Sequence, residues 1–145
     1  MHRITFAILL LVLVGVPRVA SASLDSFLSN VNVQARADLP GFSLKVSAQF
    51  GVPVPRVEAV LGVVATPADA FMVFQLGQMA HRPPEAVVQT YRTHKGKGWG
   101  VIAKELGIKP GSREFHALKN GDLTFGEPPG EGPGKGKGTG KGHKK

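Results

Sequence analysis

The sequence predicts an all-α domain: an orthogonal bundle of about six or seven short helices, followed by a disordered tail. Apolar residues recur at helical spacing along most of the chain, and no sustained period-two alternation bounded by glycine or proline is present. The expected helices are joined by short connections of two to five residues. Connections of this length favour short crossing helices over long antiparallel rods.

The first 22 residues have the three parts of a secretory signal peptide. Residues 1–3 form a short basic start, residues 4–16 are an almost unbroken apolar run, and residues 20–22 read Ala-Ser-Ala, a site that signal peptidase cuts. The apolar run is shorter than the roughly 20 residues that span a bilayer. We therefore expect an exported protein, periplasmic or extracellular, whose mature chain begins at Ser23 and has no transmembrane segment.

Composition divides the mature chain into a domain at residues 23–126 and a tail at residues 127–145. The domain holds 11 basic and 8 acidic residues. Its length suits a single hydrophobic core that is stable without covalent crosslinks. The chain has no cysteine, so the fold uses no disulfide. The predicted partners are an envelope protein or a polyanion, with non-specific binding of nucleic acid a further possibility.

Individual residues predict where helices begin and end. Thr66 and Pro67 form a good helix start, because threonine accepts a backbone N–H and proline suits the first turn. The helix that they open has the widest apolar stripe and is predicted to be the most buried. Ser112 is expected to cap a last short helix, and Gly51 and Gly121 are expected to end helices in the left-handed conformation.

Two segments resemble helix-turn-helix units. Residues 43–52 align with residues 99–108, with small or apolar residues at matching positions and a glycine at Gly51 and Gly107. One interpretation is ordinary packing of two short helices. The alternative is a DNA-binding unit whose second helix reads bases. In the unit that begins at residue 99, the DNA-contact candidates on the second helix are Arg113, His116 and Lys119.

A lysine- and glycine-rich loop precedes the helix expected to begin at Trp99. Free backbone N–H groups at a glycine-rich turn, together with two lysines, suit a phosphate, sulfate or carboxylate. We favour the alternative, a tight turn between helices with solvated lysines. Trp99 then begins a regular apolar stripe with Ile102, Ala103 and Leu106, and it is expected to be a core residue rather than a ligand platform. The candidate anion-binding residues are Lys95, Gly96, Lys97, Gly98 and Gly100.

The tail repeats this lysine–glycine chemistry without apolar side chains. Glycine occupies every even position from Gly130 to Gly142, so we expect disorder. Without aromatic residues the tail offers polyanions charge but no stacking surface, and it serves either as a polyanion contact or as a solubilising extension. The tail lysines are Lys135, Lys137, Lys141, Lys144 and Lys145.

The sequence contains no motif for a metal, a cofactor or a nucleophilic active site. His81, His94 and His116 are 13 and 22 residues apart, unlike clustered zinc ligands. Neither a phosphate-binding P-loop nor a dinucleotide-binding fingerprint occurs. We therefore favour a non-enzymatic binding protein, with a DNA-binding protein or a cell-wall enzyme as alternatives.

One stretch resembles a known pattern. Residues 96–107 read G-x-G-W-G-x-I-A-x-x-L-G, similar to a motif of small exported bacterial helical proteins of unknown function. The resemblance covers roughly residues 83–120. It implies a bacterial helical protein located outside the cytoplasm, and it carries no catalytic or ligand-binding residues.

Overall fold

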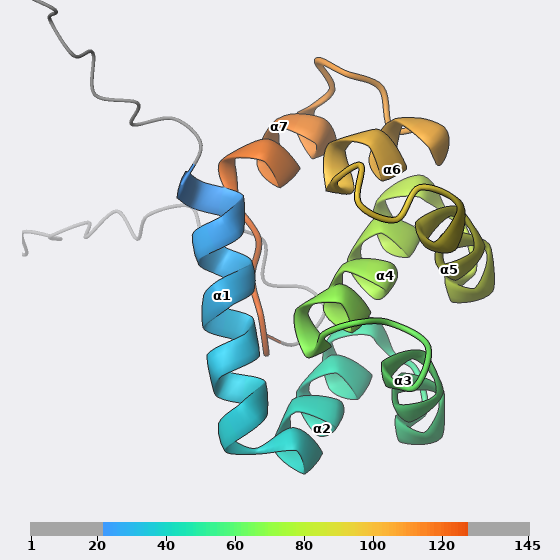
Figure 1. The fold of residues 1–145 in the computed structure, drawn as a ribbon. Helices are drawn as coiled ribbons and strands as arrows, with labels where there is room; N and C mark the ends of the chain where they lie inside the picture. Colours follow the sequence, from blue (N-terminus) through green and yellow to red (C-terminus); the bar gives the residue numbers. More distant parts are fainter. Residues whose placement is uncertain (1–21, 128–145) are drawn as a thin grey trace, which may run out of the picture.

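The computed structural model describes residues 22–127, and within that range the chain is all-helical (Figure 1). The predicted signal peptide and tail lie outside the described residues, except for Ala22 and Glu127. No helix in the described part is long and apolar enough to cross a bilayer. The helices are α1 (Ala22–Ala37), α2 (Leu39–Phe50), α3 (Val54–Leu61), α4 (Pro67–Ala80), α5 (Pro84–Thr93), α6 (Trp99–Glu105) and α7 (Arg113–Asn120).

Helix α4 is the centre of the bundle. It packs against α1, α2, α3 and α5, and eight of its residues are buried. Figure 1 shows it running through the middle of the molecule, with α1 and α2 on one side and α5 on the other. The prediction that this helix is the most buried is confirmed. An apolar surface nearly all the way round is what a central helix requires.

The predicted helix ends are confirmed. The Thr66 hydroxyl accepts the Asp69 amide at 3.2 Å, and the Ser112 hydroxyl accepts the Phe115 amide at 3.2 Å. Gly51 follows α2 at φ 62° and Gly121 follows α7 at φ 68°. Both glycines take the left-handed conformation that lets a helix end without a Cβ clash.

A contact between two helices far apart in sequence adds to the cap of α4. The Oδ1 atom of Asn32 in α1 accepts the backbone N–H of Ala68 at 2.8 Å. Ala68 lies in the first turn of α4, where backbone N–H groups lack a partner within the helix. The bond therefore fixes α1 against α4 and satisfies a buried donor.

After α7 the chain folds back into the bundle. Its last described segment, residues 122–127, runs beside α1 (Figure 1). The Phe125 ring packs at 5.4 Å from the Phe42 ring and edge-on at 5.8 Å from the Phe71 ring. The Lys45 ammonium lies 5.4 Å from the Phe125 ring centre. The core thus closes with a non-helical segment.

Two expectations about apolar residues differ in the structure. The spacing of Leu39, Phe42, Val46 and Phe50 predicts one apolar stripe on a helix. Leu39 is nevertheless 47% exposed, because it is the first residue of α2 and precedes the face that packs. Trp99 packs against the core but is only partly buried, because α6 begins at the surface after a glycine turn. Its indole therefore keeps a solvent-facing part.

Candidate functional site

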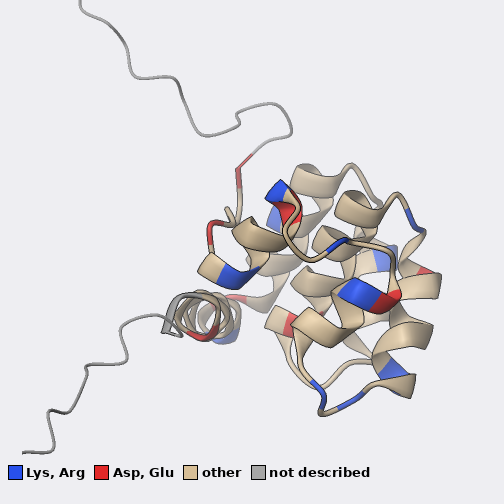
Figure 2. Cartoon of the chain, turned by 90° about the horizontal axis from the view of Figure 1, so that it is seen from above, with Lys and Arg blue, Asp and Glu red and all other residues tan. Residues whose placement is uncertain are grey.

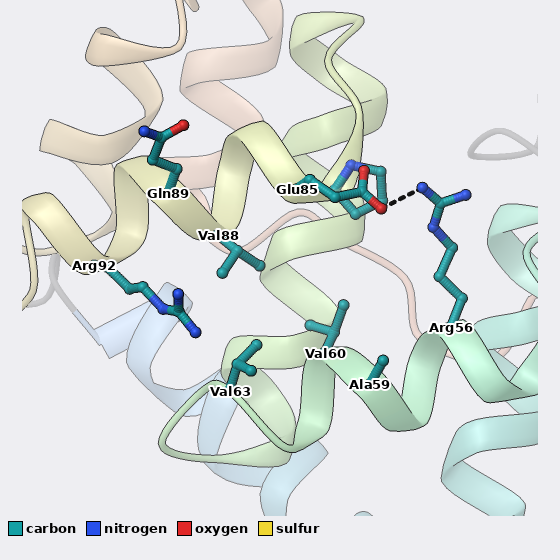
Figure 3. Close-up of a pocket in the computed structure, with 9 residues that line it drawn as sticks. Arg56, Ala59, Val60, Val63, Glu85, Val88, Gln89 and Arg92 are labelled. Atoms are coloured by element: carbon teal, nitrogen blue, oxygen red, sulfur yellow. Dashed lines mark hydrogen bonds and ion pairs between the residues drawn. The ribbon is translucent and has the colours of Figure 1, made fainter.

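An open groove of about 470 Å³ lies between α3 and α5. In Figure 3, Val60 and Val63 point from the α3 side toward α5, and Val88 points back from α5. Val63 is 41% exposed, which is high for a large apolar residue. The groove is therefore an apolar surface that this domain leaves uncovered.

The two walls of the groove have the same residue spacing. On α3 and just beyond it, the lining residues are Arg56, Ala59, Val60 and Val63. On α5, they are Glu85, Val88, Gln89 and Arg92, with Pro84 at the end. Both sets fall at i, i+3, i+4 and i+7, which is one face of a helix over about 10 Å of its length.

Charge differs between the two ends of the groove. At one end the guanidinium of Arg56 donates to the Glu85 carboxylate and joins the N-terminal halves of α3 and α5. The backbone N–H of Glu85 and the Arg56 side chain hold the pKa of the Glu85 carboxyl below its ordinary value. At the other end Arg92 is exposed and has no acidic partner among the described residues. The open end thus carries an uncompensated positive charge.

Part of the predicted anion-binding loop lines a second hollow, of about 380 Å³. Lys95, Gly96 and Gly98 contribute to its wall, whereas Lys97 and Gly100 do not. The remaining wall comes from three helices: Asp69 of α4, Tyr91 of α5, and Trp99 and Ile102 of α6. The structure therefore places the loop beside an aromatic and acidic wall that the sequence did not reveal.

The Tyr91 hydroxyl is fixed inside this second hollow. It donates to Asp69 Oδ2 at 3.1 Å and accepts the Ala65 amide at 3.3 Å. Burial raises the pKa of this hydroxyl, and the negative charge of Asp69 raises it further, against the opposing effect of the Ala65 bond. The phenol therefore stays protonated and continues to donate to Asp69.

The DNA-contact candidates all lie on α7, with Arg113, His116 and Lys119 exposed. Lys119 lies over the Phe115 ring, 5.9 Å from its centre. The connection before α7 spans residues 106–112, whereas α2 and α3 are joined by residues 51–53 alone. Figure 2 shows basic and acidic positions spread over several helices and loops rather than gathered on one element. The DNA-binding hypothesis stays a prediction.

The tail lysines lie outside the described residues. Among residues 22–127, no group of three or more histidine, aspartate or glutamate side chains is placed to hold a metal ion. His94 bonds the Thr90 carbonyl of its own helix through Nδ1 at 3.1 Å.

Sequence reasoning missed the groove because it considers one helix at a time. The valines of both walls have the spacing of ordinary core positions, and nothing local distinguishes Val63 and Val88 from buried valines. A weak signal exists in Arg56 and Glu85, which occupy the first turns of neighbouring helices with opposite charge. No known protein-family model, curated protein or solved structure matches this chain.

Proposed function

We propose that this protein is an exported, non-enzymatic binding module that holds an amphipathic helix of a partner protein in the groove between α3 and α5. The observation that carries the proposal is the pair of matched stripes, which include the exposed Val63 and the partly buried Val88. Amphipathic helices commonly bind in hydrophobic grooves, to which they present their own apolar residues at i, i+3, i+4 and i+7. The signal-like N-terminus supports a partner in the cell envelope.

The other common modes of peptide recognition fit this groove less well. Addition of a partner strand requires a free sheet edge, and the described residues contain no strand. Recognition of a polyproline helix uses grooves lined by aromatic rings, whereas these walls are aliphatic. A helix needs only an apolar trough, because its own backbone hydrogen bonds are already satisfied.

The charges define the partner further. Glu85 neutralises Arg56, so the remaining charge of the groove is that of Arg92. We expect a partner helix of two to three turns whose apolar face ends in an aspartate or glutamate beside Arg92. Each wall of the groove is only about two helical turns long, so the interface should be small and the complex transient.

The lysine tail supplies a second, weaker attraction in this proposal. Five lysines on a glycine-rich chain attract anionic polymers or lipids without selecting among them. Replacing all five with serine in the full-length chain should remove the salt-sensitive binding to anionic polymers and lipids and leave the groove interaction unchanged. Loss of the groove interaction in that variant would contradict this division of roles.

Site-specific crosslinking tests the groove. A photoreactive phenylalanine analogue replaces Val63 in the full-length exported protein, and the crosslinked partner peptide is identified by mass spectrometry. The matched control carries the same analogue at Val33, which is 62% exposed on α1 and far from the groove in sequence. The proposal requires that the position 63 product contain an amphipathic helix with an acidic residue.

The purified partner then provides the quantitative test. Val63→Asp should abolish binding, and Arg92→Glu should weaken it about five- to tenfold by placing two negative charges together. Changing the partner's acidic residue to lysine should restore binding to the Arg92→Glu variant. Identical crosslinks from positions 33 and 63, or no effect of Val63→Asp, would exclude the groove as the binding surface. Recovery of intact Met1 on the mature protein would contradict export.

A further inference from the structure

The hollow beside Trp99 is separate from the groove between α3 and α5. None of its lining residues is shared with the groove, and the two are built on different faces of α5. Its volume of about 380 Å³ lies within the range of small-ligand sites. A ligand in the hollow would therefore use none of the residues proposed to bind the partner helix in the groove.

An aromatic pair forms one wall of the hollow. The Tyr91 and Trp99 rings stack with their centres 5.5 Å apart and their planes 22° from parallel. Tyr91 is only 7% exposed and is held by two hydrogen bonds through its hydroxyl. Because the stacked tyrosine is fixed, it supports the more exposed indole of Trp99 as a rigid apolar platform.

Polar groups of both kinds face the same space. Asp69 uses Oδ2 to accept the Tyr91 hydroxyl, and its other carboxylate oxygen has no hydrogen-bond partner among the described residues. Lys95 lines the hollow from the loop and forms no ion pair with Asp69. The hollow thus offers an acceptor, a donor and an aromatic face to one ligand.

We infer that this hollow is a binding site for a neutral saccharide. A sugar ring has an apolar face of C–H groups that lies flat on an indole, and hydroxyl groups around its edge that both donate and accept hydrogen bonds. Such a ligand uses Trp99, Asp69 and Lys95 together. Asp69 would repel a simple anion, and Lys95 would repel a cation.

The chain contains one tryptophan, so its fluorescence reports on this hollow alone. The full-length protein is titrated with cellotriose, triacetylchitotriose and maltotriose, and separately with inorganic phosphate and tetramethylammonium, each to about 50 mM. We expect a saturable change in Trp99 emission with at least one trisaccharide and none with the two ions. A saturable response to phosphate without one to sugar would overturn the inference in favour of a simple anion site. A response to tetramethylammonium alone, or no response at all, would also overturn it.

Matched variants connect the response to the lining. Asp69→Asn keeps the side-chain shape and should weaken saccharide binding about tenfold, because a hydrogen bond to a charged acceptor is lost. Lys104→Gln removes an exposed charge on α6 that does not line the hollow, and it should leave binding unchanged. Far-UV circular dichroism melts verify that each variant is folded. If Asp69→Asn folds and binds sugar as well as the original protein does, the assignment of the ligand to this hollow is wrong.

Discussion

The Gln49 side chain in α2 donates a hydrogen bond to the Thr124 carbonyl, 75 residues later in the chain, at 2.8 Å. The same amide accepts the backbone N–H of Gly126 at 2.8 Å through its oxygen. One buried side chain therefore satisfies two backbone groups of a segment that has no secondary structure of its own. These two bonds hold Phe125 between them, against the rings of α2 and α4.

Gln49→Ala should release this segment. The variant loses two partly buried hydrogen bonds, so we expect about 1–3 kcal/mol of lost stability. Urea unfolding measures the loss, and amide exchange at Gly126 should speed up more than exchange in α4. Gln34→Ala on the exposed side of α1 is the matched control and should be near neutral. Equal effects of the two changes would show that the clamp contributes nothing.

Asn32→Ala should destabilise the start of α4. It removes the acceptor of the Ala68 amide, and we expect a cost of about 1–2 kcal/mol, as for loss of an N-terminal cap. Asn32→Asp keeps an acceptor and adds a charge that the helix N-terminus favours, so it should retain most of the stability. Chemical denaturation measures the stability of the original protein and of both Asn32 variants. If Asn32→Asp loses as much stability as Asn32→Ala, the hydrogen bond to the Ala68 amide is not what stabilises the contact between α1 and α4.

Two glycine substitutions should change the stability of the protein in opposite directions. A Cβ at Gly77 would lie 2.9 Å from the backbone oxygen of Arg82, so Gly77→Ala should cost about 1–3 kcal/mol. A Cβ at Gly100 meets nothing within 4 Å, so Gly100→Ala should stabilise α6 by about 0.4–1 kcal/mol. Thermal unfolding of both variants tests the pair. Stabilisation by Gly77→Ala would mean that the connection after α4 does not approach Gly77 this closely.

Arg56→Gln should raise the pKa of the Glu85 carboxyl only part of the way toward its ordinary value. The bond from the backbone N–H of Glu85 is the larger cause of the lowered pKa, and it remains in the variant. Because the folded-state pKa is lowered, the contribution of Glu85 to stability is present above its ordinary pKa. That contribution is lost as the pH falls through the lowered value. A carboxyl NMR titration of both proteins measures the shift, and complete restoration would assign the whole effect to Arg56.

Alkaline pH should weaken the fold through Tyr91. Its pKa is raised above 10.0 in the folded protein, so its contribution to stability is full below that value and is lost as the pH rises through the raised pKa. Unfolding midpoints measured from about pH 8 to 11 should fall more steeply for the original protein than for Tyr91→Phe. If the midpoints of the two proteins fall in parallel with pH, ionisation of the Tyr91 hydroxyl does not affect folding.

Sequence patterns predicted those parts of the fold that depend on local chemistry. Thr66, Ser112 and Gly51 act on residues within a few positions of themselves, so their roles are visible in a short window. Asn32 and Gln49 act on residues tens of positions away, and no periodicity marks them. Polar residues that bond across the bundle look like ordinary surface residues until the helices are placed.

The candidate sites also combine residues that local sequence predicts with residues that only the fold brings close. The lysine–glycine loop was visible in sequence, because glycine and lysine mark a turn with free N–H groups. The acidic and aromatic wall opposite it comes from Asp69 and Tyr91, which lie on two other helices. Trp99 was expected to be a core residue because its stripe is regular, yet the first residue of a surface helix cannot be fully covered.

The position of α4 limits how this chain can be divided. Because α4 packs against α1, α2, α3 and α5, a break in the connection before it leaves this apolar helix without three of these four neighbours. Neither fragment would have a core of its own, and both would expose the surface that α4 joins. The two pieces would regain structure only by associating with each other. A split version of this protein would therefore behave as a complementation pair, with folding that depends on fragment concentration.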